Sequence, residues 1–180
     1  MGDQRLRAPH YFNRAWIAPI FFGASGYIVA ERAHLPGSIG GGKNAFGVFG
    51  GKFGMAYQLY DDFQSIWGVP EKTGKKRAGD IYERKKTLPV IYARKHLADA
   101  DGKHLESLYD RNGELGEAMV DDVLSLLAHT DARGVLERRA NQYKKESVEA
   151  LADTDLPSAT KMLLEQVARE LVPDSIAEPG

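Results

Sequence analysis

The sequence contains no cysteine among its 180 residues. This absence excludes disulfide frameworks, cysteine-ligated zinc, iron–sulfur clusters and thiol catalysis. It is compatible with a reducing compartment, and we expect a cytoplasmic protein. Charge of one sign is not in excess either, because 24 Lys and Arg residues balance 25 Asp and Glu residues. A formal net charge of −1 argues against a strongly basic nucleic-acid coat and against a highly acidic disordered chain.

Long apolar runs are also lacking. The most apolar stretch, residues 16–30, contains Pro19, Gly23 and Gly26 and is shorter than the roughly 20 residues that span a bilayer. The first seven residues, MGDQRLR, have no apolar run of the signal-peptide type. We therefore expect a soluble protein with no membrane span.

The spacing of apolar residues predicts an all-α fold in a single domain, residues 1–180. Period-2 alternation is not sustained anywhere, and hairpin signals are missing. Two loops are expected, a glycine-rich one at 37–44 and a lysine-rich one at 68–80. The predicted helices cover residues 11–33, 45–67, 82–97, 102–111, 114–129, 132–151 and 156–171.

The glycine-rich segment 37–44 nearly matches the phosphate-loop pattern GxxxxGK[ST]. Its last position is Asn44, which lacks the hydroxyl that would bind magnesium, and no strand is predicted before it. We therefore interpret it as a connection between helices.

A stronger signal is the acid pair Asp61 and Asp62 inside an otherwise apolar helix. Adjacent carboxylates in such a place repel each other and lose hydration unless a cation neutralises them. Magnesium suits this task because it prefers oxygen ligands and keeps its remaining waters. Gln58 lies one turn earlier on the same face and can reach the same cavity.

The charge inverts directly after the acid pair. Residues 70–95 carry nine basic side chains and three acidic ones. An acid pair that binds metal, followed by a lysine-rich loop, is the combination that a diphosphate requires. A nucleic-acid patch is the competing interpretation, but the acid pair would repel a phosphate backbone, and interleaved aromatic residues are lacking.

The segment 46–89 reads FGVFGGKFGMAYQLYDDFQSIWGVPEKTGKKRAGDIYERKKTLP. It resembles the second aspartate-rich region of trans-isoprenyl diphosphate synthases, the polyprenyl synthetase family. Within that family, its residues most resemble those of actinobacterial geranylgeranyl diphosphate synthases. The resemblance covers the carboxy-terminal half of that family's fold. It implies an incomplete class I terpenoid synthase helical bundle around a deep cavity.

The resemblance also implies a prenyltransferase of isoprenoid biosynthesis that condenses an allylic diphosphate with isopentenyl diphosphate under magnesium. By position, Asp61 and Asp62 would hold Mg²⁺, while Gln58, Lys75 and Lys85 would bind diphosphate. Asp80 occupies the position of the aspartate that precedes the Gly-Lys lysine. No side-chain nucleophile is needed, because metals and lysines stabilise the departing diphosphate.

The sequence departs from the family pattern at several positions. Ser65 replaces the third acidic residue of the motif, and Trp16-Ile17 align with the family's Lys-Thr pair. The first aspartate-rich motif and the carboxy-terminal arginine pattern are absent. We therefore expect that the chain does not complete the chemistry alone, and that residues 11–33 and 45–67 expose apolar faces unless a partner covers them.

Three alternatives to an autonomous synthase stay open. One is a non-catalytic partner subunit that forms a homo- or heterodimer with a fuller homologue. Another is a class I terpene cyclase, which the apolar Trp16-Ile17 pair favours modestly. A nucleic-acid module ranks last. The resemblance implies that product chain length is set by residues near the first aspartate-rich motif.

Overall fold

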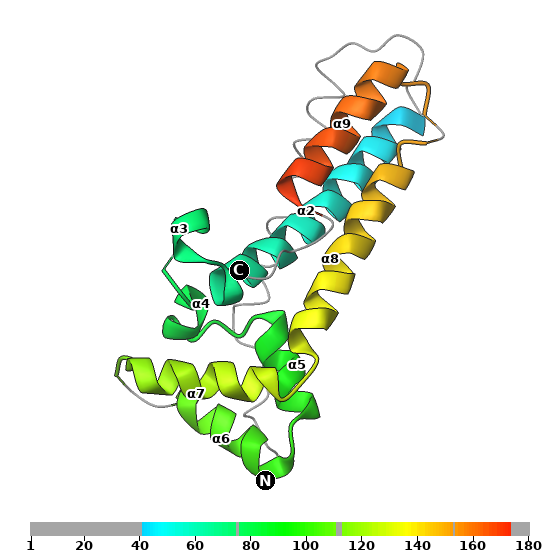
Figure 1. Ribbon diagram of the computed structural model, residues 1–180. Helices are drawn as coiled ribbons and strands as arrows, with labels where there is room; N and C mark the ends of the chain where they lie inside the picture. Colours follow the sequence, from blue (N-terminus) through cyan, green and yellow to red (C-terminus); the bar gives the residue numbers. More distant parts are fainter. Residues whose placement is uncertain (1–40, 75, 111–112, 153, 174–180) are drawn as a thin grey trace. The chain divides into compact units, whose positions relative to one another are not determined.

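Every regular element is a helix in the residues that the computed structural model describes, which are 41–74, 76–110, 113–152 and 154–173 (Figure 1). This confirms the predicted all-α fold. The predicted helix 11–33, residues 37–40 and Lys75 lie outside the described residues. The helices are α2 (Gly41–Trp67), α3 (Pro70–Thr73), α4 (Gly79–Tyr82), α5 (Leu88–His96), α6 (Asp99–Asp110), α7 (Glu117–Ala128), α8 (Ala132–Glu149) and α9 (Ser158–Leu171).

The described chain forms two compact units. The first contains residues 41–58 and 142–173, and the second contains residues 59–141. Helices α2 and α8 each contribute one part to each unit, so the chain passes twice between them within a helix.

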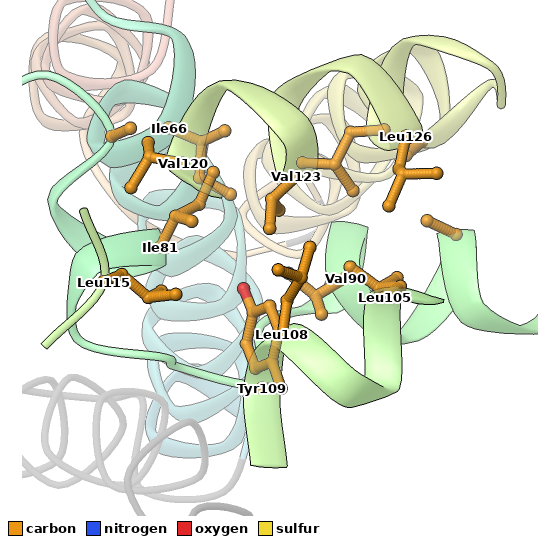
Figure 2. Close-up of a cluster of buried hydrophobic side chains, with 14 residues drawn as sticks. Ile66, Ile81, Val90, Leu105, Leu108, Tyr109, Leu115, Val120, Val123 and Leu126 are labelled. Atoms are coloured by element: carbon orange, nitrogen blue, oxygen red, sulfur yellow. The ribbon is translucent and has the colours of Figure 1, made fainter. Parts of the chain in front are cut away.

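The second unit is built on an apolar cluster to which the end of α2 and helices α4 to α7 contribute (Figure 2). Large aliphatic residues at helical spacing on α6 and α7 supply six of its fourteen buried members. Burial of such side chains stabilises the unit by roughly 25 cal/mol for each Å² of apolar surface removed from water. The most buried large side chains of the cluster, at 2% exposure or less, are Ile66, Ile81, Leu105, Leu127, Val120 and Val123.

The first unit joins the amino-terminal part of α2 to the end of α8 and to α9. The Nζ atom of Lys52 on α2 lies 2.6 Å from a carboxylate oxygen of Glu146 on α8, and 5.2 Å from the ring centre of Tyr143. The buried Lys144 donates a 2.7 Å hydrogen bond to the carbonyl of Val172, directly after α9. A lysine at a helix carboxyl end offsets the partial negative charge of the last carbonyls.

Three predicted boundaries were wrong for identifiable reasons. Helix α2 already includes Gly41, so the predicted loop 37–44 is helical over 41–44. Glycine costs less in a first turn, where the amides have no intrahelical partner in any case. The predicted loop 68–80 contains the short helix α3, which has Pro70 at its start and the left-handed Gly74, with φ of 66°, as its cap.

The predicted helix 82–97 is interrupted. Helix α4 ends at Tyr82, Arg84 has a left-handed φ of 50°, and α5 begins at Leu88. The interruption follows from Pro89, because a proline inside a helix lacks the amide hydrogen and crowds the preceding turn, whereas in the first turn of α5 neither effect has a cost. The remaining helices lie within a few residues of their predicted positions.

The expected exposure of α2 was also wrong. Seven of its apolar side chains are buried, and Val48 is the one large apolar side chain that is exposed on the described part of this helix. The other exposed large apolar side chains of the described chain lie on α9, and they are Met162, Leu163, Val167 and Leu171. No helix among the described residues has the length and apolar character needed to cross a membrane.

We predict that Leu127→Ala lowers the free energy of unfolding by about 2–5 kcal/mol, because Leu127 is fully buried and its truncation leaves a cavity. Urea unfolding followed by circular dichroism measures the change. Leu163→Ala, at a position 60% exposed on α9, is the matched control and should change stability by less than about 0.5 kcal/mol. Equal losses in the two variants would contradict the assignment of the core.

The Lys52–Glu146 ion pair predicts that the stability of the fold depends on pH. A hydrogen bond from Lys52, aided by Gln142, lowers the pKa of Glu146 below its ordinary value. The stability from this carboxylate is therefore present at neutral pH and is lost as the pH falls through the lowered pKa. Glu146→Gln should lower the urea midpoint at pH 7, and by less at about pH 3, because part of the stabilisation is lost once the pH falls below the ordinary pKa of glutamate and approaches the lowered pKa. Glu149→Gln, which affects the exposed pair with Lys145, should change neither midpoint.

Candidate functional site

Helix α2 places the acid pair among buried side chains. Asp61 and Asp62 are both partly buried, and their neighbours Leu59 and Phe63 are buried. Gln58 is also partly buried and lies one turn earlier on the same helix. The helix and the apolar surroundings that the sequence predicted are confirmed, while the role of these residues as ligands stays a prediction.

Ser65, at the third position of the motif, is buried. A buried hydroxyl on the same helix is a poor substitute for the third carboxylate that the family pattern places there. Asp61 and Asp62 are therefore the two carboxylates that this helix offers to a cation.

A second charged group lies on the turn between α4 and α5. The Nζ atom of Lys85 lies 2.6 Å from Oδ1 of Asp80 and 3.0 Å from Oε2 of Glu83. The Asp80 side chain is 8% exposed, whereas that of Glu83 is 65% exposed. The structure thus brings together two residues, Asp80 and Lys85, that the resemblance had named separately. They belong to the same compact unit as Asp61 and Asp62.

The backbone holds this turn in an unusual conformation. Ala78 and Arg84, on either side of α4, have φ of 53° and 50°. A left-handed conformation costs a residue other than glycine about 1–2 kcal/mol. By the resemblance, Arg84 stands at the glycine of the family's Gly-Lys pair, and glycine is the residue that adopts a left-handed φ without steric cost. The backbone amide of Lys85 donates a 2.9 Å hydrogen bond to the carbonyl of Asp80, which closes the turn.

The electrostatics of the turn keep Lys85 charged. Burial by itself would lower the pKa of Lys85, but the hydrogen bonds to Asp80 and Glu83 outweigh it and raise this pKa above its ordinary value. Because the folded pKa is the higher one, the stability from this group is present at neutral pH and is lost only as the pH rises above about 10.4.

Tyr109 on α6 forms the buried side of this region. Its ring lies in the apolar cluster, and its hydroxyl has no hydrogen-bond partner among the described residues (Figure 2). Burial raises the pKa of Tyr109, the charge of Asp80 raises it further, and Arg84 opposes the effect. Tyr109 therefore stays neutral beside the charged turn.

The donor set fits magnesium in one specific way. The described residues contain no group of three Asp, Glu or His side chains that could hold a metal by themselves. Magnesium, however, is commonly bound by one or two carboxylates together with waters and substrate phosphates. Asp61 and Asp62 suit that mode, in which the metal site is completed by a phosphorylated ligand.

Sequence reasoning missed Glu83 and Tyr109. Glu83 was counted only as one acidic residue in a basic segment, and residues two apart do not face each other on a helix, so the predicted helix 82–97 gave no reason to pair it with Lys85. Tyr109 gave no signal, because an apolar helix position occupied by tyrosine is common in any core. Lys75, the third predicted diphosphate ligand, lies outside the described residues.

Comparison with known proteins finds relatives among the prenyl diphosphate synthases. The chain is 31% identical over 153 residues to a farnesyl diphosphate synthase of Mycobacterium bovis, an alignment that covers 83% of this chain and 41% of the relative. It is 32% identical over 84 residues to heptaprenyl diphosphate synthase component 2 of Bacillus subtilis, which covers 47% of this chain and 23% of that protein. The chain thus spans less than half the length of these relatives.

A solved structure shows the same fold. It is a geranylgeranyl pyrophosphate synthase of Corynebacterium glutamicum complexed with calcium and isoprenyl diphosphate, 26% identical with a TM-score of 0.67, and the match covers 83% of this chain and 45% of that one. The described helices therefore form an incomplete isoprenyl synthase bundle. The family model named Polyprenyl synthetase matches residues 26–127, which is more than half of the 180 residues, and the chain belongs to that family.

Proposed function

We propose that this chain provides the magnesium- and diphosphate-binding half of a trans-prenyltransferase, which condenses an allylic diphosphate with isopentenyl diphosphate. The observation that carries the proposal is the partly buried acid pair Asp61–Asp62 on α2, in the same compact unit as the Asp80–Lys85 turn. Two carboxylates for a divalent cation and a fixed lysine for phosphate oxygens are what recognition of a diphosphate demands.

Each residue has a distinct part in this proposal. Asp61 and Asp62 hold the cation, and Gln58 offers an amide to the same diphosphate group. The ammonium of Lys85 binds a phosphate oxygen, and the resemblance assigns the same role to Lys75. Magnesium, when bound, supplies the positive charge that stabilises the leaving diphosphate.

The relatives support this assignment of chemistry. The Mycobacterium bovis relative is a farnesyl diphosphate synthase, and the Corynebacterium glutamicum structure holds a divalent cation together with isoprenyl diphosphate. Both proteins are more than twice as long as the part that matches this chain. The proposal that this chain binds diphosphate therefore does not include the claim that it catalyses the condensation alone.

A second candidate is a partner subunit of a heteromeric synthase. The Bacillus subtilis relative is described as component 2 of its enzyme, and it is similar to this chain over 84 residues. In this role the chain would supply α2 and the Asp80–Lys85 turn to a fuller homologue, and it would be inactive by itself.

We predict that Asp61→Asn combined with Asp62→Asn weakens the magnesium-dependent binding of inorganic diphosphate by at least ~100-fold, since even indirect partners of metal ligands account for 10–100-fold. Isothermal titration calorimetry with and without magnesium measures this loss. The matched control is Asp121→Asn with Asp122→Asn, an adjacent acid pair exposed on α7. Unchanged affinity in the first variant, or an equal loss in the control, would refute the proposed metal site.

The two candidates predict different activities. A self-sufficient synthase should form longer prenyl diphosphates from allylic diphosphate, isopentenyl diphosphate and magnesium. A partner subunit should show product only when it is co-expressed with a full-length homologue, and the two chains should still co-purify after Asp61→Asn and Asp62→Asn. Product analysis by mass spectrometry decides between them, and the absence of product in both settings would contradict both.

A further inference from the structure

The ammonium of Lys85 contacts two carboxylates, one buried and one exposed to solvent. Its Nζ atom lies 2.6 Å from Oδ1 of Asp80 and 3.0 Å from Oε2 of Glu83. An ammonium has three N–H donors, so these two contacts leave one donor for another acceptor. The Asp80 side chain is 8% exposed, and the Glu83 side chain is 65% exposed. A buried carboxylate loses much when its cation leaves, whereas an exposed one is readily rehydrated.

The backbone fixes one of these contacts and leaves the other loose. Asp80 and Lys85 are joined twice, through their side chains and through the 2.9 Å bond from the Lys85 amide to the Asp80 carbonyl. Arg84 anchors the turn to α6, because its Nε donates a 3.3 Å hydrogen bond to the carbonyl of Leu108. The Glu83 carboxylate reaches Lys85 from the solvent side of the turn.

We propose that Glu83 is an exchangeable counter-ion of Lys85 that an incoming diphosphate displaces, while Asp80 is the positioning residue that keeps the ammonium in place. The inference rests on the proposed function, because it assumes that Lys85 binds the diphosphate. Diphosphate replaces Glu83 because it carries more negative charge and offers more acceptor oxygens than one carboxylate.

The test compares variants of the full 180-residue chain titrated with inorganic diphosphate in magnesium chloride. Glu83→Gln should tighten binding by about 2- to 5-fold, which corresponds to the strength of an exposed ion pair. In the Lys85→Met background, the same change should leave the weakened affinity unaltered. The matched control is Asp99→Asn, since Asp99 forms an exposed 2.9 Å ion pair with Lys103, which is not among the residues proposed to bind diphosphate. It should have no effect on affinity.

A simple repulsion between carboxylates and diphosphate predicts a different pattern. In that case Glu83→Gln and Asp80→Asn would both tighten binding, with or without Lys85. The proposal requires opposite signs, with Asp80→Asn weakening the affinity, and thermal unfolding confirms that each variant is folded. Equal signs, or an effect of Glu83→Gln that survives Lys85→Met, would overturn the inference while leaving the proposed function intact. Failure of the unaltered chain to bind magnesium diphosphate would overturn both.

Discussion

The cost of removing charge from water is the constraint on which this structure depends. Helix α2 buries apolar side chains on both sides of Asp61 and Asp62, so two adjacent like charges sit where water cannot fully screen them. An ordinary helix would place such a pair on an exposed face, as α7 does with Asp121 and Asp122. A pair held partly buried is stabilised by a cation, and this requirement links the fold of α2 to its proposed chemistry.

The turn between α4 and α5 meets the same constraint with protein groups alone. Asp80 is buried, and Lys85 neutralises it at 2.6 Å. To hold that geometry, the chain accepts left-handed conformations at Ala78 and Arg84, neither of which is glycine. Strained backbone of this kind persists only where the surrounding structure enforces it, and it concentrates at functional sites. The apolar cluster under α4, with Ile81 fully buried, supplies that enforcement.

The sequence predicted most of the helices, because their apolar residues recur with the helical period. It failed where the effect of glycine and proline depends on their position in a helix. Gly41 lies in the first turn of α2, and Pro89 lies in the first turn of α5 instead of within a longer helix. The acid pair was predictable from local chemistry. The contact between Asp80 and Lys85 was not, because it depends on the left-handed Arg84, and no propensity assigns that conformation to arginine.

Recognition of the diphosphate and accommodation of the hydrocarbon are physically separable tasks. The first needs a few charges held at fixed positions, and Asp61, Asp62, Asp80 and Lys85 all lie in one unit with its own apolar cluster. The second needs a long apolar wall that no pair of charges provides. The chain spans 41% of the length of the farnesyl diphosphate synthase it resembles. In the proposed function, these four charged residues would hold the diphosphate end of the substrate on a stable core, and none of them contributes apolar surface for its hydrocarbon end. Binding of diphosphate and turnover are therefore separate properties, which separate measurements test.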